Sequence, residues 1–234
     1  MTAVVTGAAG GIGWALCRRL AGEGHSIVAV DVSPRLADLV AELERGGARV
    51  VPVEADLTDP SGPEAVAAAC PSGLSVLVNN AGITRDARLV NLTAADFRAV
   101  LEVNLGAAYR LTTSLVPLIG QGAVVNISSR AYLGNFGQFN YSMSKGGLVG
   151  MTRALAQSLA PHIRVNAVAP GLIATEMAQG IPDEVREKMV AAIPLGRMGE
   201  PEEVAELVAF LASDRASYLT GEVLVIGGGR SLSR

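Results

Sequence analysis

The sequence is poor in the residues that mark several other classes of protein. It contains only 2 Cys and 2 His among 234 residues, too few for a disulfide framework or a zinc cluster, so we expect no metal site. Lys+Arg 19 against Asp+Glu 22 gives a net charge of −3 without a block of like charges, which argues against nucleic acid or an anionic membrane as a partner. Charged, Gly or Pro residues interrupt each apolar run before the ~20 residues that cross a bilayer. We therefore expect a small-molecule ligand.

The composition favours one large folded core. Half of the residues are hydrophobic and 18% are charged, which excludes disorder. The length suits one domain over residues 1–234, because no linker-like segment divides it. Met1-Thr2 leads directly into Ala3-Val4-Val5, without the charged region and apolar stretch of a secretory signal. We expect a cytoplasmic protein with reduced thiols.

Short β-branched runs alternate with longer segments of helical period, which predicts an α/β fold of the Rossmann type, with a doubly wound seven-stranded parallel sheet and helices on both faces. The predicted strands are Ala3–Thr6, Ser26–Val30, Val50–Glu54, Ser75–Asn79, Ala123–Ile127, Arg164–Val168 and Val223–Ile226. Helices are predicted to begin near Ile12, Pro34, Pro60, Ala94, Phe139 and Pro201. The segment Thr175–Met198, with a short helix around Pro182–Ala192, leaves the strand ends without returning directly, as a substrate lid does.

A glycine-rich run joins the first strand to the first helix. Thr6-Gly7-Ala8-Ala9-Gly10-Gly11-Ile12-Gly13 places glycines where a backbone turns tightly and approaches a pyrophosphate at a helix N-terminus. An ordinary strand-to-helix turn can also carry such glycines. Asp31 follows the second strand at about the distance expected for a carboxylate that binds an adenosine ribose. It could instead cap the helix near Pro34, although Ser33 is better placed for that role.

Asp31 also bears on the choice of cofactor. Its negative charge would repel a 2′-phosphate, and neither Val32 nor Gly10 supplies a compensating cation. NAD(H) is therefore the expected cofactor, with NADP(H) possible because Arg35 lies within a turn of the site. Methyltransferases that bind S-adenosylmethionine share a glycine loop followed by an acid, so a second motif has to separate the two classes.

That second motif is a tyrosine followed four residues later by a lysine. Tyr141 and Lys145 fall on one face of a predicted helix, one turn apart, and Lys145 is one of only two lysines in the chain. A phenol with a pKa of ~10 is a poor acid-base group at neutral pH, and a nearby ammonium group lowers that pKa. We therefore expect Lys145 to lower the pKa of Tyr141. Upstream, a strand ends in Ser128-Ser129, at the sheet edge where α/β proteins bind ligands.

Together these residues resemble the short-chain dehydrogenase/reductase family, in the subgroup that includes the bacterial 3-oxoacyl-acyl-carrier-protein reductases. The resemblance extends over almost the whole chain. The residues that carry it are Thr6-Gly7-x-x-x-Gly11-Ile12-Gly13, Asp56-Leu57, Asn79-Asn80-Ala81-Gly82, Asn104, Ser129, Tyr141-x-x-x-Lys145 and Pro170-Gly171.

The resemblance implies a role for each matching residue in the exchange of a hydride between a nicotinamide and a carbonyl or secondary alcohol. Tyr141 would transfer the proton, Ser129 would hydrogen-bond the carbonyl oxygen, Lys145 would bind the nicotinamide ribose, and Asn104 would hold a water in a proton relay. Asn104 could instead make only a local hydrogen bond that bends its helix. The cofactor would also contact Asp56, Leu57, Asn80, Ala81, Gly82, Pro170, Gly171, Ile173 and Thr175. Asp56 could equally be a turn acid.

The family also implies a homotetramer built from the helices around Ala107–Leu118 and Leu148–Leu159 and the last strand. Two departures leave alternatives open. The loop from Ser129 to Tyr141 is one residue short, so spacing favours Ser128 while strand alignment favours Ser129. Reductases of acyl-carrier substrates carry basic docking residues where this chain has Gly120-Gln121-Gly122 and Pro161-His162, although Arg130 and Arg164 are nearby.

The departures leave the substrate open. The main expectation is a 3-oxoacyl thioester on an acyl-carrier protein or coenzyme A, with use of the carrier protein uncertain. Dehydrogenation of a small secondary alcohol, a sugar alcohol or a hydroxysteroid is the alternative within the same chemistry. A nucleotide-binding scaffold without catalysis is the alternative of another class, although a scaffold need not keep Ser129, Tyr141, Lys145 and Asn104 together.

Overall fold

The computed structural model describes residues 1–70 and 73–232, and over these residues it contains one seven-stranded sheet. The strands are β1 (Thr2–Thr6), β2 (Ser26–Asp31), β3 (Val50–Glu54), β4 (Leu74–Asn79), β5 (Gly122–Ile127), β6 (Ile163–Pro170) and β7 (Val223–Ile226). Every pairing is parallel, in the order β3-β2-β1-β4-β5-β6-β7. The predicted fold class and all seven predicted strands are confirmed.

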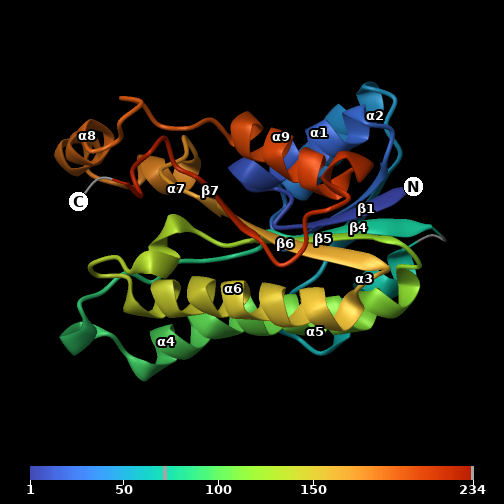
Figure 1. Cartoon of the computed structure of the whole chain (residues 1–234), viewed down its shortest axis with the longest axis horizontal. Coiled ribbons are helices and arrows are strands. Elements are labelled where there is room, and N and C mark those ends of the chain that lie inside the picture. Colours follow the sequence, from blue (N-terminus) through green and yellow to red (C-terminus); the bar gives the residue numbers. More distant parts are fainter. Residues whose placement is uncertain (71–72, 233–234) are drawn as a thin grey trace.

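Helices cover both faces of the sheet (Figure 1). One layer holds α1 (Gly11–Gly22), α2 (Leu36–Arg45) and α9 (Pro201–Ala212), and the other holds α3 (Ser61–Ala69), α4 (Ala94–Leu101), α5 (Ala107–Leu115) and α6 (Phe139–Leu159). Two short helices, α7 (Glu176–Gln179) and α8 (Asp183–Ala191), follow β6, where the sequence predicted an excursion with its own helix. Single-turn helices fill several loops, among them η4 (Arg130–Leu133).

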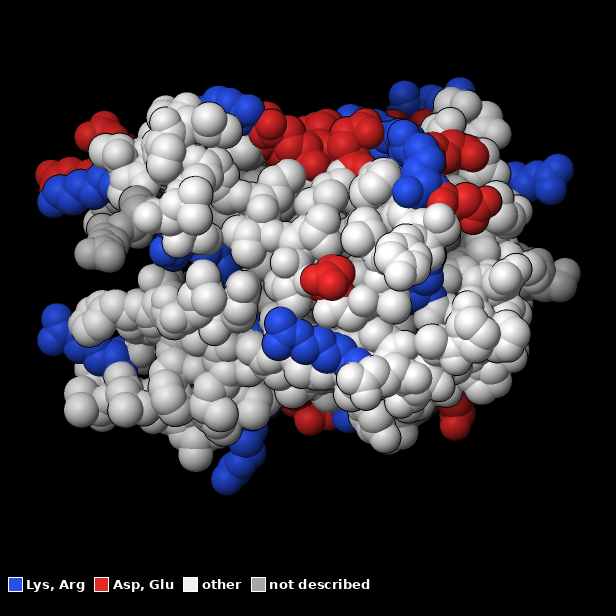
Figure 2. Space-filling model, viewed as in Figure 1, with Lys and Arg blue, Asp and Glu red and all other residues white. Residues whose placement is uncertain are grey.

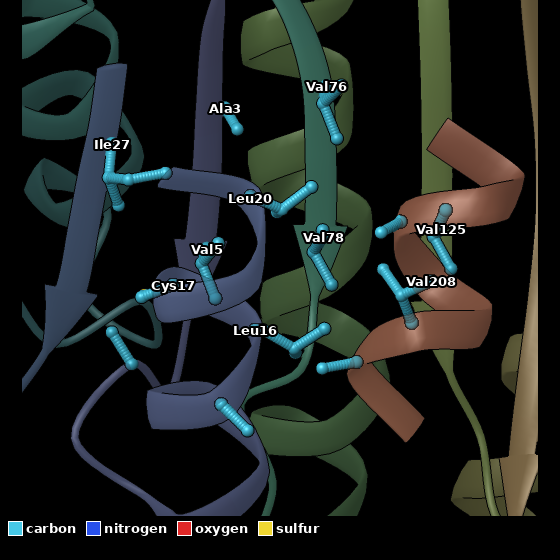
Figure 3. Close-up of a cluster of buried hydrophobic side chains, with 14 of the residues drawn as sticks. Ala3, Val5, Leu16, Cys17, Leu20, Ile27, Val76, Val78, Val125 and Val208 are labelled. Carbon is cyan, nitrogen blue, oxygen red and sulfur yellow. The ribbon is translucent and has the colours of Figure 1, made fainter. Parts of the chain in front are cut away.

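Alternate residues of the central strands pack into two separate cores, because successive side chains of a strand point to opposite faces. Ala3 and Val5 of β1 join Leu16 and Leu20 of α1 and Val208 of α9 in one buried cluster (Figure 3). Val4, from the same strand, packs on the other face in a cluster with Leu111 of α5 and Val165 of β6. Residues buried on both faces explain why these strands are almost continuously apolar.

The structure differs from the prediction at the start of one helix and in the interior of another. Helix α2 begins at Leu36 rather than near Pro34, and its N-cap position, Arg35, makes no side-chain capping bond. Neither Asp31 nor Ser33 caps it: Ser33 Oγ instead accepts a hydrogen bond from the Arg35 N–H in the preceding turn. The helix predicted from Ala94 changes to π-helical winding over Glu102–Gly106 before it continues as α5.

The direction of the sheet order reverses between β1 and β4. From β1 the chain proceeds outward through β2 to β3, then returns to β4 on the other side and continues to β7. In open α/β sheets the crevice outside the carboxyl ends of the strands at such a reversal is the usual ligand site. Within the described residues, we find no helix with the length and apolarity needed to span a membrane.

Candidate active site

A cleft of about 1050 Å³ lies at the carboxyl ends of the strands. It is lined by residues from every predicted motif: Gly7, Gly10, Gly11, Ile12, Gly13, Asp31, Asp56, Leu57, Asn80, Ala81, Gly82, Ser128, Ser129, Tyr141, Lys145, Pro170, Gly171, Ile173 and Thr175. The exception among the predicted site residues is Asn104, which is buried behind the cleft wall. The fold thus gathers residues separated by more than 160 positions around one cavity large enough for a dinucleotide and a small substrate.

The glycine loop forms a cradle that larger residues would fill. Gly7 has a φ of +61°, which favours glycine, and a Cβ at Gly13 would lie 1.9 Å from the Gly7 carbonyl oxygen. Gly10 occupies the N-cap position of α1 without a side-chain cap. The first amides of α1 therefore face the cleft uncapped by a side chain, which suits a pyrophosphate. The loop fits a dinucleotide cofactor.

Hydrogen bonds from β1 and β4 hold this loop in place. Thr6 Oγ1 accepts from the backbone N–H groups of Asn80 at 2.9 Å and Ala81 at 3.0 Å. The Asn80 side-chain amide donates to the carbonyl oxygens of Thr6 at 2.9 Å and Gly7 at 3.1 Å. Asn80 therefore fastens the glycine loop to the end of β4 through its own amide group.

Asp31 lies at the predicted place, at the end of β2. Its carboxylate accepts hydrogen bonds from the N–H groups of Ala9 at 2.9 Å and Ser33 at 2.9 Å, so it also fixes the glycine loop. Arg35 forms an ion pair with Glu176 of α7 and stacks over Trp14, with 5.9 Å between its Cζ atom and the ring centre. The cation that could have received a 2′-phosphate is thus engaged with an acid across the cleft.

The remaining predicted cofactor contacts come from the two side walls. Asp56 accepts hydrogen bonds from Thr58 N–H at 2.8 Å and Thr58 Oγ1 at 2.7 Å, the geometry of a turn acid, while it also lines the cleft beside Leu57. On the opposite wall Thr175 approaches the glycine loop, since a Cβ at Gly11 would lie 3.0 Å from Thr175 Cγ2. The segment after β6 therefore closes over the loop.

Tyr141 and Lys145 lie on one face of α6, as predicted, with 5.6 Å between Lys145 Nζ and the centre of the Tyr141 ring. Lys145 is buried, and Nζ donates a hydrogen bond to the Ile127 carbonyl oxygen at 2.8 Å. Burial lowers the pKa of this ammonium group to about 8. Burial thus makes the charged form of this lysine less favourable than that of an exposed lysine, although it still predominates below pH 8.

The predicted lowering of the Tyr141 pKa is wrong for the protein without ligand. Burial of the phenol raises its pKa, a hydrogen bond with the Ser129 side chain opposes that rise, and the charge of Asp86 adds to it. Lys145 is not among the causes of this shift, and its ammonium group is directed toward the Ile127 carbonyl oxygen. The Tyr141 phenol is therefore protonated at neutral pH in the protein without ligand.

The two serines after β5 point to different partners. Ser128 is buried and its hydroxyl donates to the Lys145 carbonyl oxygen at 2.8 Å, which ties β5 to α6. Ser129 Oγ accepts a hydrogen bond from the Ala131 N–H at 3.1 Å at the start of η4, and its hydroxyl is the partner of the Tyr141 phenol. Strand alignment was therefore a better guide than loop length to the serine that lies beside the tyrosine.

Asn104 lies in the π-helical segment, a kind of winding found often at functional sites. Its Oδ1 accepts from the Ile83 N–H at 2.8 Å, and its Nδ2 donates to the Ile83 carbonyl oxygen at 3.0 Å and to Ser144 Oγ at 3.0 Å. A Cβ at Gly82 would lie 3.2 Å from Asn104 Oδ1 and 3.3 Å from Lys145 Nζ. Protein groups thus occupy the side chain, and the predicted water relay stays a prediction.

Several cleft residues were missed by sequence reasoning. Asp86 lines the cleft and accepts a hydrogen bond from Gln138 Nε2 at 2.8 Å. Arg130 and Arg230 also line it, although they are 100 residues apart. The position of Arg130 directly after Ser129 was a usable signal, whereas nothing in the sequence placed Arg230 near the serines.

The fold and the cleft define an oxidoreductase of the nicotinamide-dependent class, and comparison with known proteins agrees. A family model described as enoyl-(acyl carrier protein) reductase matches residues 7–231. The chain is 46% identical to 3-oxoacyl-[acyl-carrier-protein] reductase FabG of Thermotoga maritima, over 97% of this chain and 96% of that protein. It is 41% identical to (3R)-3-hydroxyacyl-CoA dehydrogenase of Mus musculus, over 97% of this chain and 95% of that protein.

Among solved structures, one similar chain is described as a putative NAD(P) dependent gluconate 5-dehydrogenase from Beutenbergia cavernae with bound NADP at low occupancy. The two share 39% identity with a TM-score of 0.92, over 99% of this chain and 97% of that chain. The chain belongs to the short-chain dehydrogenase/reductase family. Members of this family use NAD or NADP, and the chain is an oxidoreductase.

Proposed function

We propose that the protein reduces the keto group of 3-oxoacyl thioesters to a secondary alcohol with a nicotinamide dinucleotide as reductant. The observation that carries this proposal is the pairing of the Ser129 and Tyr141 hydroxyls beside buried Lys145 in one cleft. Two adjacent hydroxyl donors suit a single carbonyl oxygen. The 3-oxoacyl reductase and 3-hydroxyacyl-CoA dehydrogenase activities named for two relatives support the choice of substrate.

The nicotinamide, when bound, supplies the hydride. Tyr141 Oη donates its proton to the substrate oxygen, because the phenol is protonated at neutral pH and lies beside Ser129. Ser129 Oγ donates a hydrogen bond to the same oxygen and stabilises that charge. Lys145 Nζ would bind the ribose hydroxyls of the cofactor, and its ammonium group would favour the phenolate that the proton transfer leaves.

Asn104 acts as a positioning residue in this scheme. Through Ile83 and Ser144 it joins the loop after β4 to α6, the helix that carries the tyrosine and the lysine. The π-helical winding around it also leaves room for a backbone carbonyl to bind a water, because one helical hydrogen bond is displaced at such a bulge. That water would supply the proton relay.

We propose NADH as the preferred reductant. Asp31 would accept hydrogen bonds from the adenosine ribose, and its charge opposes a 2′-phosphate. The ion pair between Arg35 and Glu176 adds to this preference, since a phosphate would have to compete with a carboxylate for the same guanidinium group. Asp56, Leu57 and Asn80 would contact the adenosine half.

Residues 175–198 would form a lid over the substrate, within one catalytic domain that spans residues 1–234. This segment contributes Thr175, Glu176 of α7 and Met189 of α8 to the wall of the cleft. A homotetramer through α5, α6 and β7 would follow the pattern of the family. Exposed Tyr109 on α5 and half-exposed Val225 on β7 support it, because an interface would cover both.

The test is reduction of 3-oxobutanoyl-coenzyme A by the purified protein with NADH, followed by absorbance of the reduced nicotinamide. We expect 3-hydroxybutanoyl-coenzyme A as the product, identified by mass spectrometry. 2-Butenoyl-coenzyme A serves as the comparison, because the family model is described as an enoyl reductase. Faster NADH oxidation with the 2-enoyl thioester would overturn the proposal, since two hydroxyl donors beside one oxygen offer little to a carbon-carbon double bond.

A further inference from the structure

Two arginines lie at the substrate end of the cleft, and none of the catalytic or cofactor-binding roles proposed above uses them. Arg130 is the first residue of η4, directly after Ser129, and Arg230 lies in the segment that follows β7. Consecutive Cα atoms are about 3.8 Å apart, so the Arg130 side chain begins next to the proposed carbonyl donor. Figure 2 shows Lys or Arg atoms inside the hollow between the two layers, on the left of the view.

Packing fixes the position of Arg230. Its Nη1 donates to the Met189 carbonyl oxygen of α8 at 3.0 Å, and Leu195 N–H donates to the Gly228 carbonyl oxygen at 3.2 Å. Gly228 has a φ of +59°, and a Cβ there would lie 2.6 Å from Ile193 Cγ2. The segment after β7 is therefore held closely against the segment that carries α8.

The Arg130 guanidinium group contacts the backbone of Arg230. Arg130 Nη2 donates to the Arg230 carbonyl oxygen at 3.5 Å, at the limit of a hydrogen bond, and Arg130 Nε is buried without an acceptor among the described residues. The pKa of Arg230 is lowered, chiefly by burial and further by the charge of Arg130. Arginine side chains carry a positive charge in proteins, so these two repel each other. Their mutual repulsion would be relieved by an anion placed between them.

The acidic residue in this part of the cleft, Asp86, already accepts a hydrogen bond from another side chain. Asp86 also lines the wall near Tyr141, but its carboxylate is hydrogen-bonded by Gln138 Nε2 at 2.8 Å. Glu176, farther along the cleft, is paired with Arg35. Arg130 forms no ion pair with any residue that the structure describes. Arg130 therefore has no carboxylate partner among the described residues on the side of the cleft where the carbonyl would bind.

We propose that Arg130 and Arg230 form an anion-binding subsite that holds a carboxylate of the substrate within a few bonds of its reacting keto group. The inference rests on the proposed reduction of a 3-oxoacyl group, and it specifies which 3-oxoacyl groups bind best. The carboxylate belongs either to a free 3-oxo acid or to the far end of a short dicarboxylic acyl chain. Guanidinium groups suit both, since their planar donors match a carboxylate.

The kinetic test compares charged and neutral substrates in pairs. The first pair is 3-oxobutanoate and its ethyl ester, and the second is the N-acetylcysteamine thioester of 3-oxoadipate and that of 3-oxohexanoate. We expect wild-type kcat/KM to favour the charged member of at least one pair. Arg130→Met and Arg230→Met should each lower that preference at least 10-fold while the neutral member loses less than 3-fold. The pair that responds identifies the source of the carboxylate.

Arg45→Met is the matched control, because Arg45 is exposed on α2 outside the cleft lining. It should leave both preferences unchanged. A binding measurement separates the subsite from the proposed reaction: calorimetric titration of the wild-type protein with glutarate should give a dissociation constant at least 10-fold lower than that of Arg130→Met. If no 3-oxo compound is reduced but glutarate binds in this way, the proposed function fails and the subsite stands.

Two results would overturn the subsite. One is an unchanged preference for the charged substrates in both arginine variants. The other is equal binding of glutarate by wild type and Arg130→Met, including no binding by either protein. Circular dichroism of the variants gives the folded fraction, so that a loss through misfolding is recognised by an equal loss with the neutral substrates.

Discussion

Lys145 Nζ lies 5.6 Å from the centre of the Tyr141 ring, yet it donates its hydrogen bond to the Ile127 carbonyl oxygen at 2.8 Å. The lysine is therefore held by β5 at the end of the strand that also presents Ser128 and Ser129. This link between α6 and β5 aligns the tyrosine with the serine before any ligand binds. Such preorganisation avoids reorganising the donors during the reaction.

Tyr141→Phe should lower kcat at least ~100-fold, the lower end of what general acid-base catalysis contributes. The variant removes the proton donor but keeps the ring against which Lys145 packs. The affinity for NADH should change less than 3-fold, measured by fluorescence titration, because the phenol hydroxyl is proposed to act on the substrate. A folded variant with wild-type turnover would show that another group supplies the proton.

Lys145 should make the unfolding free energy of the protein without ligand depend on pH in alkaline solution. Its pKa is about 8 in the folded chain and about 10.5 when the chain is unfolded, so the unfolded state binds more protons between these values. The contribution of this group to stability should rise from pH 8 to pH 10.5, on the order of 3 kcal/mol in total. It is constant below pH 8, where both states are protonated.

Urea unfolding of wild type and Lys145→Met across that pH range isolates this contribution, since other groups titrate in both proteins. As pH rises from 8 to 10.5, the unfolding free energy of wild type should increase relative to that of Lys145→Met. Parallel curves for the two proteins would mean that burial does not perturb the lysine.

Ser129→Ala should raise the barrier to reduction by about 2.7–4 kcal/mol, as removal of one oxyanion donor does. Ser128→Ala is the matched control, because the two serines are adjacent but face different partners. It should slow turnover far less and should cost about 1 kcal/mol of stability, from the lost hydrogen bond to the Lys145 carbonyl. Steady-state kinetics and thermal unfolding of both variants check the two effects. A larger kinetic loss for Ser128→Ala would favour the register that loop length indicated.

The sequence could predict those parts of the site that depend on local spacing or on strand order. Tyr141 and Lys145 share a helix face because they are one turn apart, and parallel strands bring their carboxyl ends to one edge. The direction of the Tyr141 pKa shift could not be predicted, because it depends on how deeply the helix is buried. Arg230 reaches Arg130 only through the packing of the segment after β7 on α8, for which no local pattern exists.

NADH should exceed NADPH in kcat/KM by at least ~10-fold, equal to ~1.4 kcal/mol. Asp31→Ala together with Gly10→Arg should reduce or reverse this ratio by removing a repulsion and adding a cation. Gly10 can carry a side chain, since it has a φ of −80° and a Cβ there would come no closer than 3.4 Å to other atoms.

Glu176→Gln tests the second part of this cofactor prediction. It frees Arg35 from its carboxylate partner, so NADPH use should rise a few-fold while NADH use stays nearly constant. Equal use of the two cofactors by the wild-type enzyme would contradict the role of Asp31. An unchanged NADPH efficiency in Glu176→Gln would contradict only the role of the ion pair.

A carrier-bound 3-oxoacyl group should be reduced about as efficiently as the same group on coenzyme A, with little dependence on salt. Gln121 and His162 are exposed at the positions where the resemblance predicts basic docking residues. Arg164, the nearby cation, donates to the carbonyl oxygens of Leu211 at 2.7 Å and Ser213 at 3.0 Å, so it is committed to the end of α9. A net charge of −3 offers an acidic carrier no long-range attraction.

The measurement is kcat/KM for both substrates between low and ~0.5 M salt, where charge steering is largely screened. Gln121→Arg with His162→Arg restores the missing charges at exposed positions far from the catalytic side chains. This double variant should gain a salt-sensitive preference for the carrier-bound substrate, whereas wild type should show none. A carrier advantage of ~10-fold or more in wild type that salt abolishes would instead mean that other arginines form the dock. The acyl-carrier-protein substrate in the name of the Thermotoga relative would then extend to this chain.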